Sequence, residues 1–504
     1  MVESHFSSEM ARNLKKTPEP SSQLTGMFID GDLSPSASES TLDVINPSNG
    51  RRLFSAPLGS EGDVGRAVNS CRAAFDDGRW SDAAPSVKKA ALRRLAELVL
   101  AEHRSLDVLD AAEMGKPVSE RLYGAAAASD LVQFCAEAVD KVAGDTFASD
   151  RNSFVAQRRV PRGVVAAVVP WNFPTYNALS KVAPALAAGN SVILKPSELS
   201  SRSAMRLAEL SISAGIPPGV FNVVTGAGEV VGRALGLHSD VDMLTFTGST
   251  EVGRHMLRYA SESNMKVVMA ECGGKSPHIV FSDGVDLVAV SRFIARHLLT
   301  NQGQICSVGS RVLIESQLMA PFLKLIQEHL SEIVPGDALD EATTYGPLAS
   351  AAQCARVMSY IQTAERDGAR LITGGRRILP ESGGYFVEPT VFTASASAKI
   401  AREEIFGPVL TVIPFETEAA AVRMANDTVY GLIAYVWTGD LSRGMRMAKQ
   451  IRSSVLINAE SPSGEGPGHA FSSEPQKQSG IGTEGGMAGV ESYLQRQLIW
   501  INHK

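Results

Sequence analysis

The stretch GVVAAVVPWNFP, Gly163 to Pro174, is a short apolar run that ends at a proline and passes into a polar segment. Its apolar part, Val164–Val169, is typical of a buried strand. A helical pattern over Asn177–Ala188 and a second apolar run, Ser191–Leu194, follow it. A strand, a helix and a strand in this order are typical of a right-handed unit in a parallel sheet. The stretch therefore predicts an α/β fold.

The same alternation continues along the chain in two series. The first ends at Ala270, and its five strands and four helices predict a parallel, doubly wound sheet. Its further strands are expected at Val220–Val224, Met243–Phe246 and Lys266–Ala270, and its further helices at Arg202–Ala214, Glu229–Leu235 and Glu251–Ala260. The second series predicts another α/β unit, with strands at Ile279–Phe281, Val312–Ile314, Leu410–Pro414, Tyr435–Thr438 and Val455–Ile457.

Three segments lie outside these series. Residues 1–25 are rich in Ser, Pro and charge, which predicts a flexible arm. Asn152–Val160 and Ser492–Ile501 are β-prone segments outside both predicted sheets. We expect these two segments to share a small extra sheet.

Composition excludes several classes of protein. The 504 residues carry a formal net charge of −6, which argues against nucleic-acid binding. No apolar run approaches the roughly 20 residues of a membrane-spanning helix, and Glu3 and Glu9 argue against a secretory signal. The five cysteines form no CxxC pair, so neither a disulfide framework nor a metal site is expected. A reducing compartment, the cytoplasm, is the predicted location.

Ligands of open α/β sheets bind beyond the carboxyl ends of the strands, so the segments that follow the predicted strands are the candidate sites. Gly248-Ser249 opens a predicted helix, where backbone N–H groups suit a pyrophosphate, although such a pair is more often a simple helix cap. Lys195 and Glu198 follow another strand. They could bind ribose hydroxyls or form a solvated surface pair.

One cysteine differs from the other four in its surroundings. Cys306 stands in NQGQICS, among polar residues and glycine, where a thiol could act as a nucleophile. Free cysteines are more often small buried residues, so composition alone leaves both interpretations open. Cys71, Cys135 and Cys354 lie in patterns that predict core positions.

Five blocks of the sequence, in this order and spacing, closely resemble the signature blocks of the NAD(P)-dependent aldehyde dehydrogenase superfamily. The resemblance extends from about Met27 to Lys504, and SNMK at 263–266 and IWI at 499–501 locally resemble the bacterial γ-glutamyl-aminobutyraldehyde dehydrogenase branch. The blocks are PWNFP (170–174), FTGST (246–250), ECGGKS (271–276), GQIC (303–306) and EIFGP (404–408).

The resemblance implies the chemistry of the site. Cys306 corresponds to the nucleophile that forms a thiohemiacetal and then a thioester. The side-chain amide of Asn172 and the backbone N–H of Cys306 correspond to the oxyanion donors. Glu271 corresponds to the base that activates water, and Glu484 to a residue linked to proton relay in some members. Because an ordinary thiol has a pKa of about 8.5, Cys306 needs activation by its site or by Glu271.

The resemblance also implies the cofactor site and the domains. NAD is expected because Glu198 would repel a 2′-phosphate, although NADP binding stays possible; no metal is implied. The implied domains are an NAD-binding domain (26–142 and 162–273), a catalytic domain (274–474) and oligomerisation strands (143–161 and 487–504). A homodimer or homotetramer is expected, with the lone strands paired across subunits. The implied cofactor residues are Trp171, Lys195, Glu198, Gly228, Gly248, Ser249, Glu404 and Phe406.

The sequence departs from the family pattern at several positions. Thr300 and Ser180 replace aromatic residues of the substrate tunnel, which predicts a wider or more polar tunnel. Leu122–Ala126 lacks the acidic pair of the aminoaldehyde branch, and the loop 459–476 lacks the usual paired glycines. Cys272 stands where leucine is common, as a core replacement or as an oxidative partner of Cys306. The substrate is therefore open.

Two other functions compete with aldehyde oxidation to an acid. A CoA-acylating semialdehyde dehydrogenase would cleave the thioester with CoA, and the presence of Glu271 argues for water instead. An inactive structural paralogue would normally have lost Cys306, Asn172 or Glu271, and all three are present.

Overall fold

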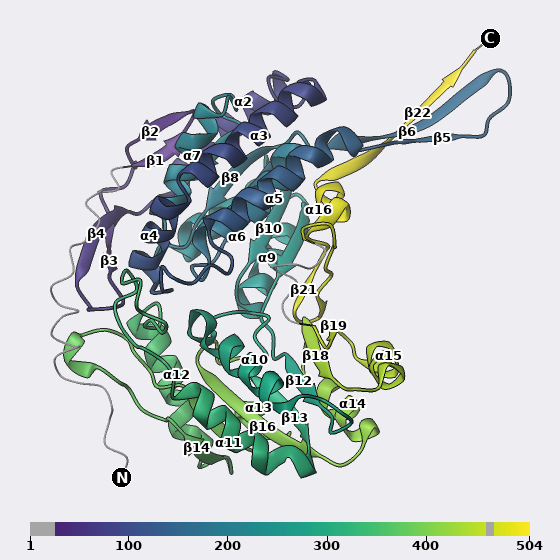
Figure 1. Cartoon of the computed structure of the whole chain (residues 1–504). Helices are drawn as coiled ribbons and strands as arrows, with labels where there is room; N and C mark the ends of the chain where they lie inside the picture. Colours follow the sequence, from purple (N-terminus) through teal and green to yellow (C-terminus); the bar gives the residue numbers. More distant parts are fainter. Residues whose placement is uncertain (1–25, 460–467, 504) are drawn as a thin grey trace.

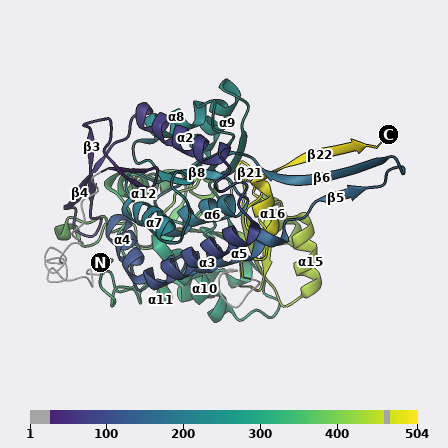
Figure 2. The same cartoon turned by 90° about the horizontal axis from the view of Figure 1, so that it is seen from above.

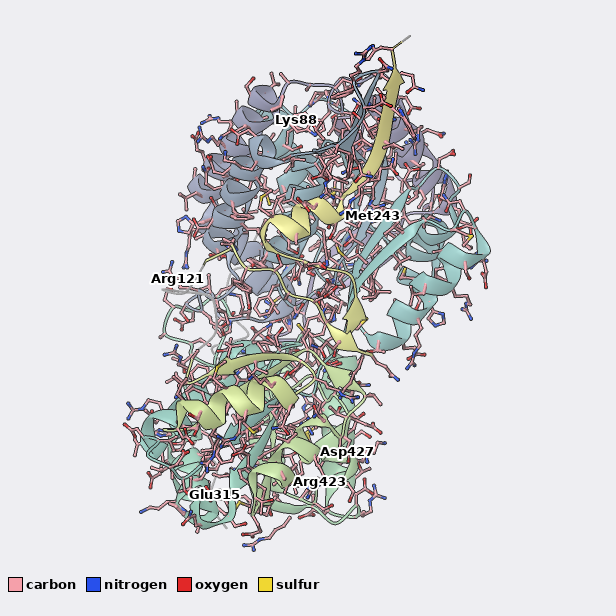
Figure 3. The ribbon with its side chains drawn as sticks, turned by 90° about the vertical axis from the view of Figure 1, so that its right-hand side faces the viewer. Lys88, Arg121, Met243, Glu315, Arg423 and Asp427 are labelled. Carbon is pink, nitrogen blue, oxygen red and sulfur yellow. The ribbon has the colours of Figure 1, made fainter. Side chains whose placement is uncertain are left out.

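The computed structural model describes residues 26–459 and 468–503 and confirms the predicted α/β architecture (Figure 1). The predicted arm, residues 1–25, lies outside the described residues. Two large sheets form the body of the chain. Figure 3 shows them one above the other, with Met243 in the upper unit and Glu315, Arg423 and Asp427 in the lower one.

The first sheet has eight strands, and the five predicted strands form its parallel centre. All residues of its two central strands, β7 and β8, are buried because helices cover both faces. Short antiparallel strands that the sequence did not predict form its edges. In spatial order the strands are β2 (Asp32–Ser34), β1 (Met27–Ile29), β9 (Phe221–Val223), β8 (Ser191–Lys195), β7 (Val164–Val168), β10 (Met243–Thr247), β11 (Val267–Glu271) and β21 (Gly480–Ile481).

Two apolar clusters fix helices to the faces of this sheet. One face carries α3 (Pro85–Ala101), α4 (His103–Met114), α5 (Ala125–Ala138), α6 (Pro174–Ala187) and α7 (Arg202–Ser213), with the hairpin β3 (Thr41–Ile45) and β4 (Arg52–Pro57) at its end. The other face carries α2 (Glu61–Asp76), α8 (Arg233–Leu237) and α9 (Thr250–Glu262). The helix predicted over Glu229–Leu235 is divided into a π-helical turn, Gly228–Gly232, and α8.

The second sheet has seven strands and contains all five strands of the second predicted series. Two strands at one side of this sheet, β14 and β15, were not predicted. The spatial order is β14 (Arg370–Thr373), β15 (Thr390–Thr393), β16 (Val409–Phe415), β13 (Arg311–Glu315), β12 (Pro277–Val280), β18 (Ile433–Trp437) and β19 (Ser454–Ile457). One face carries α10 (Leu287–Leu299) and α11 (Met319–Leu330); the other carries α12 (Ala351–Ala364), α13 (Lys399–Arg402), α14 (Glu418–Asn426) and α15 (Leu441–Gln450). A separate short pair is β17 (Tyr430–Gly431) with β20 (Gln476–Lys477), and short helical turns are Val139–Lys141, Ser316–Leu318 and Pro380–Ser382.

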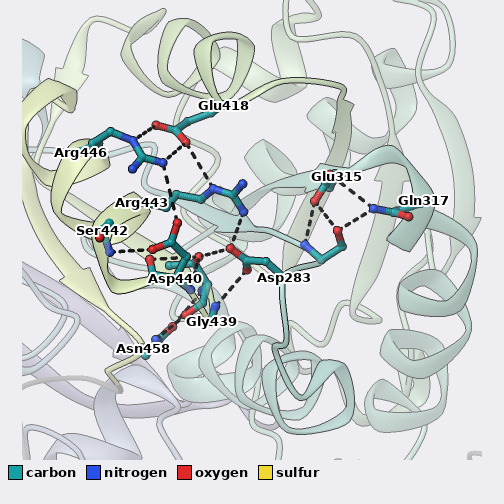
Figure 4. Close-up of polar contacts among 12 residues, drawn as sticks. Asp283, Glu315, Gln317, Glu418, Gly439, Asp440, Ser442, Arg443, Arg446 and Asn458 are labelled. Atoms are coloured by element: carbon teal, nitrogen blue, oxygen red, sulfur yellow. Dashed lines mark hydrogen bonds and ion pairs between the residues drawn. The ribbon is translucent and has the colours of Figure 1, made fainter.

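An ion-pair cluster at the end of β12 connects the segment after this strand with α14 and α15 (Figure 4). Arg443 of α15 pairs with Asp283, which follows β12, and with Glu418 at the start of α14. Arg446 also binds the Glu418 carboxylate, at 2.8 Å. The Arg443 guanidinium lies 4.5 Å from the ring centroid of Phe281, so the cluster joins charge pairing to the apolar core.

The two lone strands do form an extra sheet, but within one chain. β22 (Leu494–Asn502) pairs antiparallel with β6 (Ser153–Pro161) along its whole length, and β5 (Asp145–Phe147) lies on the other side of β6. This sheet projects from the body (Figures 1 and 2). The expected pairing of β6 with β22 across subunits is therefore wrong. The helix before β22, α16 (Gly486–Ser492), packs on α5 and α6, and this packing brings β22 beside β6.

Candidate active site

The chain order of the first sheet creates a switch point between β7 and β10. The chain runs outward from β7 through β8 and β9, then returns to the other side of β7 as β10. Ligands bind at such a point, beyond the carboxyl ends of the strands. Trp171 and Asn172 follow β7, and Gly248 and Ser249 follow β10. The sheet therefore brings four predicted site residues to one place.

The predicted helix start at Gly248-Ser249 is present. The Ser249 hydroxyl accepts a hydrogen bond from the N–H of Val252 at 3.3 Å and caps α9. A Cβ at Gly248 would lie 2.5 Å from the Phe246 ring, so packing requires glycine here. Ser249 is exposed at a helix N-terminus, where N–H groups and the helix dipole favour an anionic group.

The residues expected at the adenosine end form a partly buried pair. Lys195 Nζ lies 3.0 Å from a carboxylate oxygen of Glu198. Lys195 is only 3% exposed, which contradicts a solvated surface pair, while the Glu198 side chain remains accessible. A Cβ at Gly228 would meet no atom within 4 Å, so the surface beside this glycine has room for a flat base. These features fit the adenosine end of a dinucleotide.

The residues expected at the nicotinamide end bring the two sheets together. The Trp171 and Phe406 rings meet edge to face with centroids 5.5 Å apart. Glu404 accepts a hydrogen bond from the N–H of Gly274 at 3.0 Å, and burial raises the pKa of Glu404 to about 7. A Cβ at Gly273 would lie 2.2 Å from this carboxylate, so the close approach requires glycine. The Gly274 contact uses only one oxygen of the carboxylate, so Glu404 keeps further acceptor positions for a ribose hydroxyl.

The loop before the nucleophile has an unusual backbone. Asn301, Gln302 and Gly303 all have positive φ angles, of 45°, 53° and 71°. Non-glycine residues rarely adopt this region, and strain of this kind is found at functional sites. Asn301 donates from Nδ2 to the carbonyl of Asn172 at 2.8 Å, and Gln304 donates from Nε2 to the carbonyl of Asn301 at 3.1 Å. Buried side-chain amides thus hold the strained loop against the segment after β7.

Cys306 follows this loop beside the candidate oxyanion donor. The buried Asn172 amide donates from Nδ2 to the carbonyl of Gln304 at 3.0 Å, two residues before the cysteine. Burial, and next the charge of Glu271, raise the pKa of the partly exposed Cys306 thiol to about 12. The surroundings therefore keep the thiol protonated, and activation by the site, one of the two expected routes, is not supported. The thiol therefore gives up its proton only as its sulfur bonds to the substrate, and the Glu271→Gln variant tests whether Glu271 is the acceptor.

Glu271 has the properties of a general base. It is the last residue of β11, and burial raises its pKa to about 7, while the charge of Lys181 lowers it. A base with a pKa near the working pH is the most effective one. Its Oε1 atom is buried and receives no hydrogen bond from the described part of the chain. A water molecule bound beside Glu271 could donate a hydrogen bond to this Oε1 atom.

The structure adds Lys181, a residue that the sequence analysis missed. Lys181 is fully buried on α6 and forms an ion pair with Glu484. Burial lowers the pKa of Lys181 to about 8, and the charges of Glu271 and Cys306 oppose this shift. Glu484 itself is held by a backbone bridge to Ser473. The signal in the sequence was a lone lysine in an otherwise apolar and small-residue helix.

The other cysteines lie in the core. Cys71, Cys135 and Cys354 are buried, as the sequence patterns predict. Cys272 belongs to the cluster under α9, and a Cβ at Gly253 would lie 2.7 Å from its sulfur. This placement favours the core replacement over an oxidative partner of Cys306. Within residues 26–459 and 468–503, no group of three or more His, Cys, Asp or Glu could hold a metal, and no helix is long and apolar enough to span a membrane.

At the two expected tunnel positions that depart from the family pattern, the side-chain hydroxyl donates a hydrogen bond to a nearby backbone carbonyl. Ser180 donates to the carbonyl of Asn177 at 2.9 Å, and Thr300 donates to the carbonyl of Arg296 at 2.9 Å. Each hydroxyl oxygen can still accept a hydrogen bond. The expected wider or more polar tunnel stays a prediction.

Comparisons with known proteins identify the family of the chain. Residues 34–499 match the model of the aldehyde dehydrogenase family. The NADP/NAD-dependent aldehyde dehydrogenase PuuC of Escherichia coli is 40% identical over 94% of this chain and 95% of its own length. An indole-3-acetaldehyde dehydrogenase in complex with NAD⁺ superposes with a TM-score of 0.92 at 41% identity, covering 99% of this chain and 100% of that one. A γ-glutamyl-γ-aminobutyraldehyde dehydrogenase from Burkholderia cenocepacia gives a TM-score of 0.92 at 41% identity, covering 99% of each chain, which agrees with the local resemblance. The chain therefore belongs to the aldehyde dehydrogenase family.

Proposed function

We propose that this chain oxidises an aldehyde to a carboxylic acid, with Cys306 as nucleophile, Asn172 as oxyanion donor and Glu271 as base. The observation that carries the assignment is their juxtaposition. The Asn172 amide is hydrogen-bonded to the loop of Cys306, and the charge of Glu271 acts on the Cys306 thiol. A nucleophile, a preorganised donor and a base within one site are the minimum that this reaction needs.

The roles follow the order of bonds made and broken. Cys306 passes its proton to solvent water as its sulfur bonds to the carbonyl carbon, and the Asn172 amide and the Cys306 N–H stabilise the resulting oxyanion. NAD(P), when bound, accepts the hydride that leaves this carbon, and the thiohemiacetal becomes a thioester. Glu271 then takes a proton from water, and the hydroxide formed attacks the thioester. The acid leaves and the thiol is restored.

The test is an NADH-linked screen of aliphatic, aromatic, amino- and semialdehydes with acid analysis. We expect NADH and acid to form without CoA, and Cys306→Ala to abolish both. Acid formation that required CoA would instead support the CoA-acylating alternative. NADH formation that persisted in Cys306→Ala would remove the nucleophile from the proposal.

For the cofactor, we propose a site on the first sheet, with NAD preferred over NADP. The proposed NAD-binding domain comprises 26–142 and 162–273, and the catalytic domain comprises 274–474. The partly exposed carboxylate of Glu198 beside buried Lys195 supports this preference, because a 2′-phosphate would meet negative charge. The pyrophosphate would lie at Ser249 and the nicotinamide ribose at Glu404.

For the substrate, we propose an apolar or aromatic aldehyde rather than one carrying a free amine. An apolar cluster surrounds the residues next to the catalytic pair: Phe173 follows Asn172, and Ile305 precedes Cys306. Tyr123 packs on Phe173 with ring centroids 5.0 Å apart, in the segment where the acidic pair of the aminoaldehyde branch is missing. A higher kcat/KM for indole-3-acetaldehyde than for 3-aminopropanal is expected; the reverse order would refute this.

For the assembly, we propose a homodimer or homotetramer in the cytoplasm. The projecting sheet exposes large apolar side chains, with Trp500 66% exposed and Leu498, Ile501 and Phe154 also open. Its outer strands β5 and β22 leave backbone groups unpaired. Such a surface fits a subunit contact. The five free cysteines agree with a reducing compartment.

A further inference from the structure

Asn177 lies one helical turn into α6 and touches the candidate oxyanion donor. Its side-chain Nδ2 donates to Oδ1 of Asn172 at 3.0 Å. The Asn177 side chain is only partly buried, so its amide is accessible to water. Lys181 stands four residues later on the same helix and pairs with Glu484. One face of α6 therefore presents two polar groups to the site.

The orientation of the Asn172 amide decides whether it can act. A side-chain amide has one end that accepts hydrogen bonds and one that donates them. The carbonyl of Gln304 accepts from Nδ2 of Asn172 at 3.0 Å, and Asn177 occupies Oδ1. One N–H of Nδ2 binds Gln304, which leaves the other for a substrate oxygen. An amide turned by half a rotation would present an oxygen to the oxyanion and repel it.

We propose that Asn177 is a positioning residue that holds the Asn172 amide with its donor end toward the substrate. This inference rests on the proposed function, because it assigns a role toward the oxyanion of that reaction. Within residues 26–459 and 468–503, Asn177 is the only group recorded as donating to Oδ1 of Asn172. The carbonyl of Gln304 favours the same orientation through Nδ2, and Asn177 holds the opposite end of the amide.

The experiment compares Asn177→Leu, Asn177→Asp and the control Ser211→Ala in the full-length enzyme. Leucine keeps the branched shape and the number of heavy atoms but removes the donor. Aspartate donates only when protonated; once ionised it accepts hydrogen bonds and favours the turned amide. Ser211 is buried on the neighbouring helix α7 and donates to the backbone carbonyl of Ala208, so its loss tests the effect of removing a buried side-chain hydrogen bond elsewhere. The readouts are the NADH burst rate with hexanal and, without cofactor, hydrolysis of 4-nitrophenyl acetate.

The ester reaction uses the same nucleophile and donor but no hydride transfer. The Cys306 sulfur attacks the ester carbonyl, 4-nitrophenolate leaves with the bonding electron pair, and water cleaves the acyl enzyme. For Asn177→Leu we expect both rates to fall about 10- to 100-fold, less than or equal to the loss of a whole oxyanion donor. The NAD affinity of Asn177→Leu and both rates of Ser211→Ala should stay within about twofold of wild type, because Asn177 is not among the proposed NAD contacts and the Ser211 hydroxyl binds the carbonyl of Ala208.

The aspartate variant supplies a readout that a purely structural role would not change. Its burst rate, divided by that of wild type at each pH, should rise as pH is lowered from about 8 to about 5, because the protonated acid donates again. A pH-independent ratio, or Asn177→Leu within about twofold of wild type, would overturn the inference. If Asn177→Leu does not fold, the aspartate ratio alone decides. If the wild type forms no NADH from any aldehyde, the proposed function fails first.

Discussion

Replacing Glu271 with glutamine separates the two halves of the proposed reaction. The charge of Glu271 raises the pKa of the Cys306 thiol, so removing it makes a thiolate easier to form. Acylation, and with it a burst of NADH, should therefore survive in Glu271→Gln. Hydrolysis of the thioester should slow by about 10²- to 10⁴-fold, the usual contribution of a general base.

The pKa of Glu271 sets how much kcat should change with pH if this residue acts as the base. Burial raises the pKa of Glu271 to about 7, and the group acts as a base only when ionised. Its ionised fraction is then about one-tenth at pH 6 and about nine-tenths at pH 8. Where hydrolysis limits turnover, kcat should rise about tenfold over this interval and level off above it.

The assay is stopped-flow absorbance of NADH at a series of pH values, with burst and steady-state rates fitted separately. Glu251→Gln is the matched control, because it removes an equal charge from an exposed position on α9. The control should keep both rates and the wild-type pH profile. If Glu271→Gln loses the burst together with turnover, the carboxylate acts before hydride transfer. If the wild-type steady state is flat from pH 6 to 8, Glu271 does not limit hydrolysis as a base.

Three further predictions concern the cofactor, the buried lysine and the tail. Glu198→Gln should raise kcat/KM for NADP relative to NAD by about tenfold, since it removes a charge facing the 2′-position; a clear NADP advantage in the wild type would contradict the reasoning. Lys181→Met should move the midpoint of the kcat profile above pH 7, because the lysine charge lowers the pKa of Glu271; an unmoved midpoint in the pH titration would show that the two groups do not interact. Deletion of 494–504 should give monomers or aggregates in light scattering, and an intact oligomer would show that the projecting sheet is not the subunit contact.

The sequence predicted both sheets because their central strands are apolar runs between covering helices. β7 and β8 are buried along their whole length, so they leave a continuous apolar signal. The edge strands β21 and β14 were missed, because a two-residue strand and a half-exposed one leave no such signal. β-propensity also predicted the strands β6 and β22 and their shared sheet, but not that both come from one chain, which the docking of α16 determines.

The site was predicted where a local motif carries the chemistry. Cys306, Asn172 and Glu271 each stand in a short block, and the order and spacing of the blocks together carry the resemblance. Lys181 was missed because its partner Glu484 lies 303 positions away, and an ion pair over such a separation leaves no pattern in one sequence. The protonation of Cys306 could not be predicted either, since burial and the charge of Glu271 exist only in the folded site.

The pKa shifts at the site indicate which interactions must stabilise the transition state. Burial is the largest cause in each case: it raises the pKa of Cys306 and Glu271 and lowers that of Lys181, so this pocket disfavours isolated charge. A standing thiolate is therefore not the source of reactivity. The negative charge that forms on the carbonyl oxygen must be stabilised as it appears, by donors already in place. The strained loop from Asn301 and its amide contacts to Asn172 provide that preorganisation, because they fix a donor before the substrate arrives.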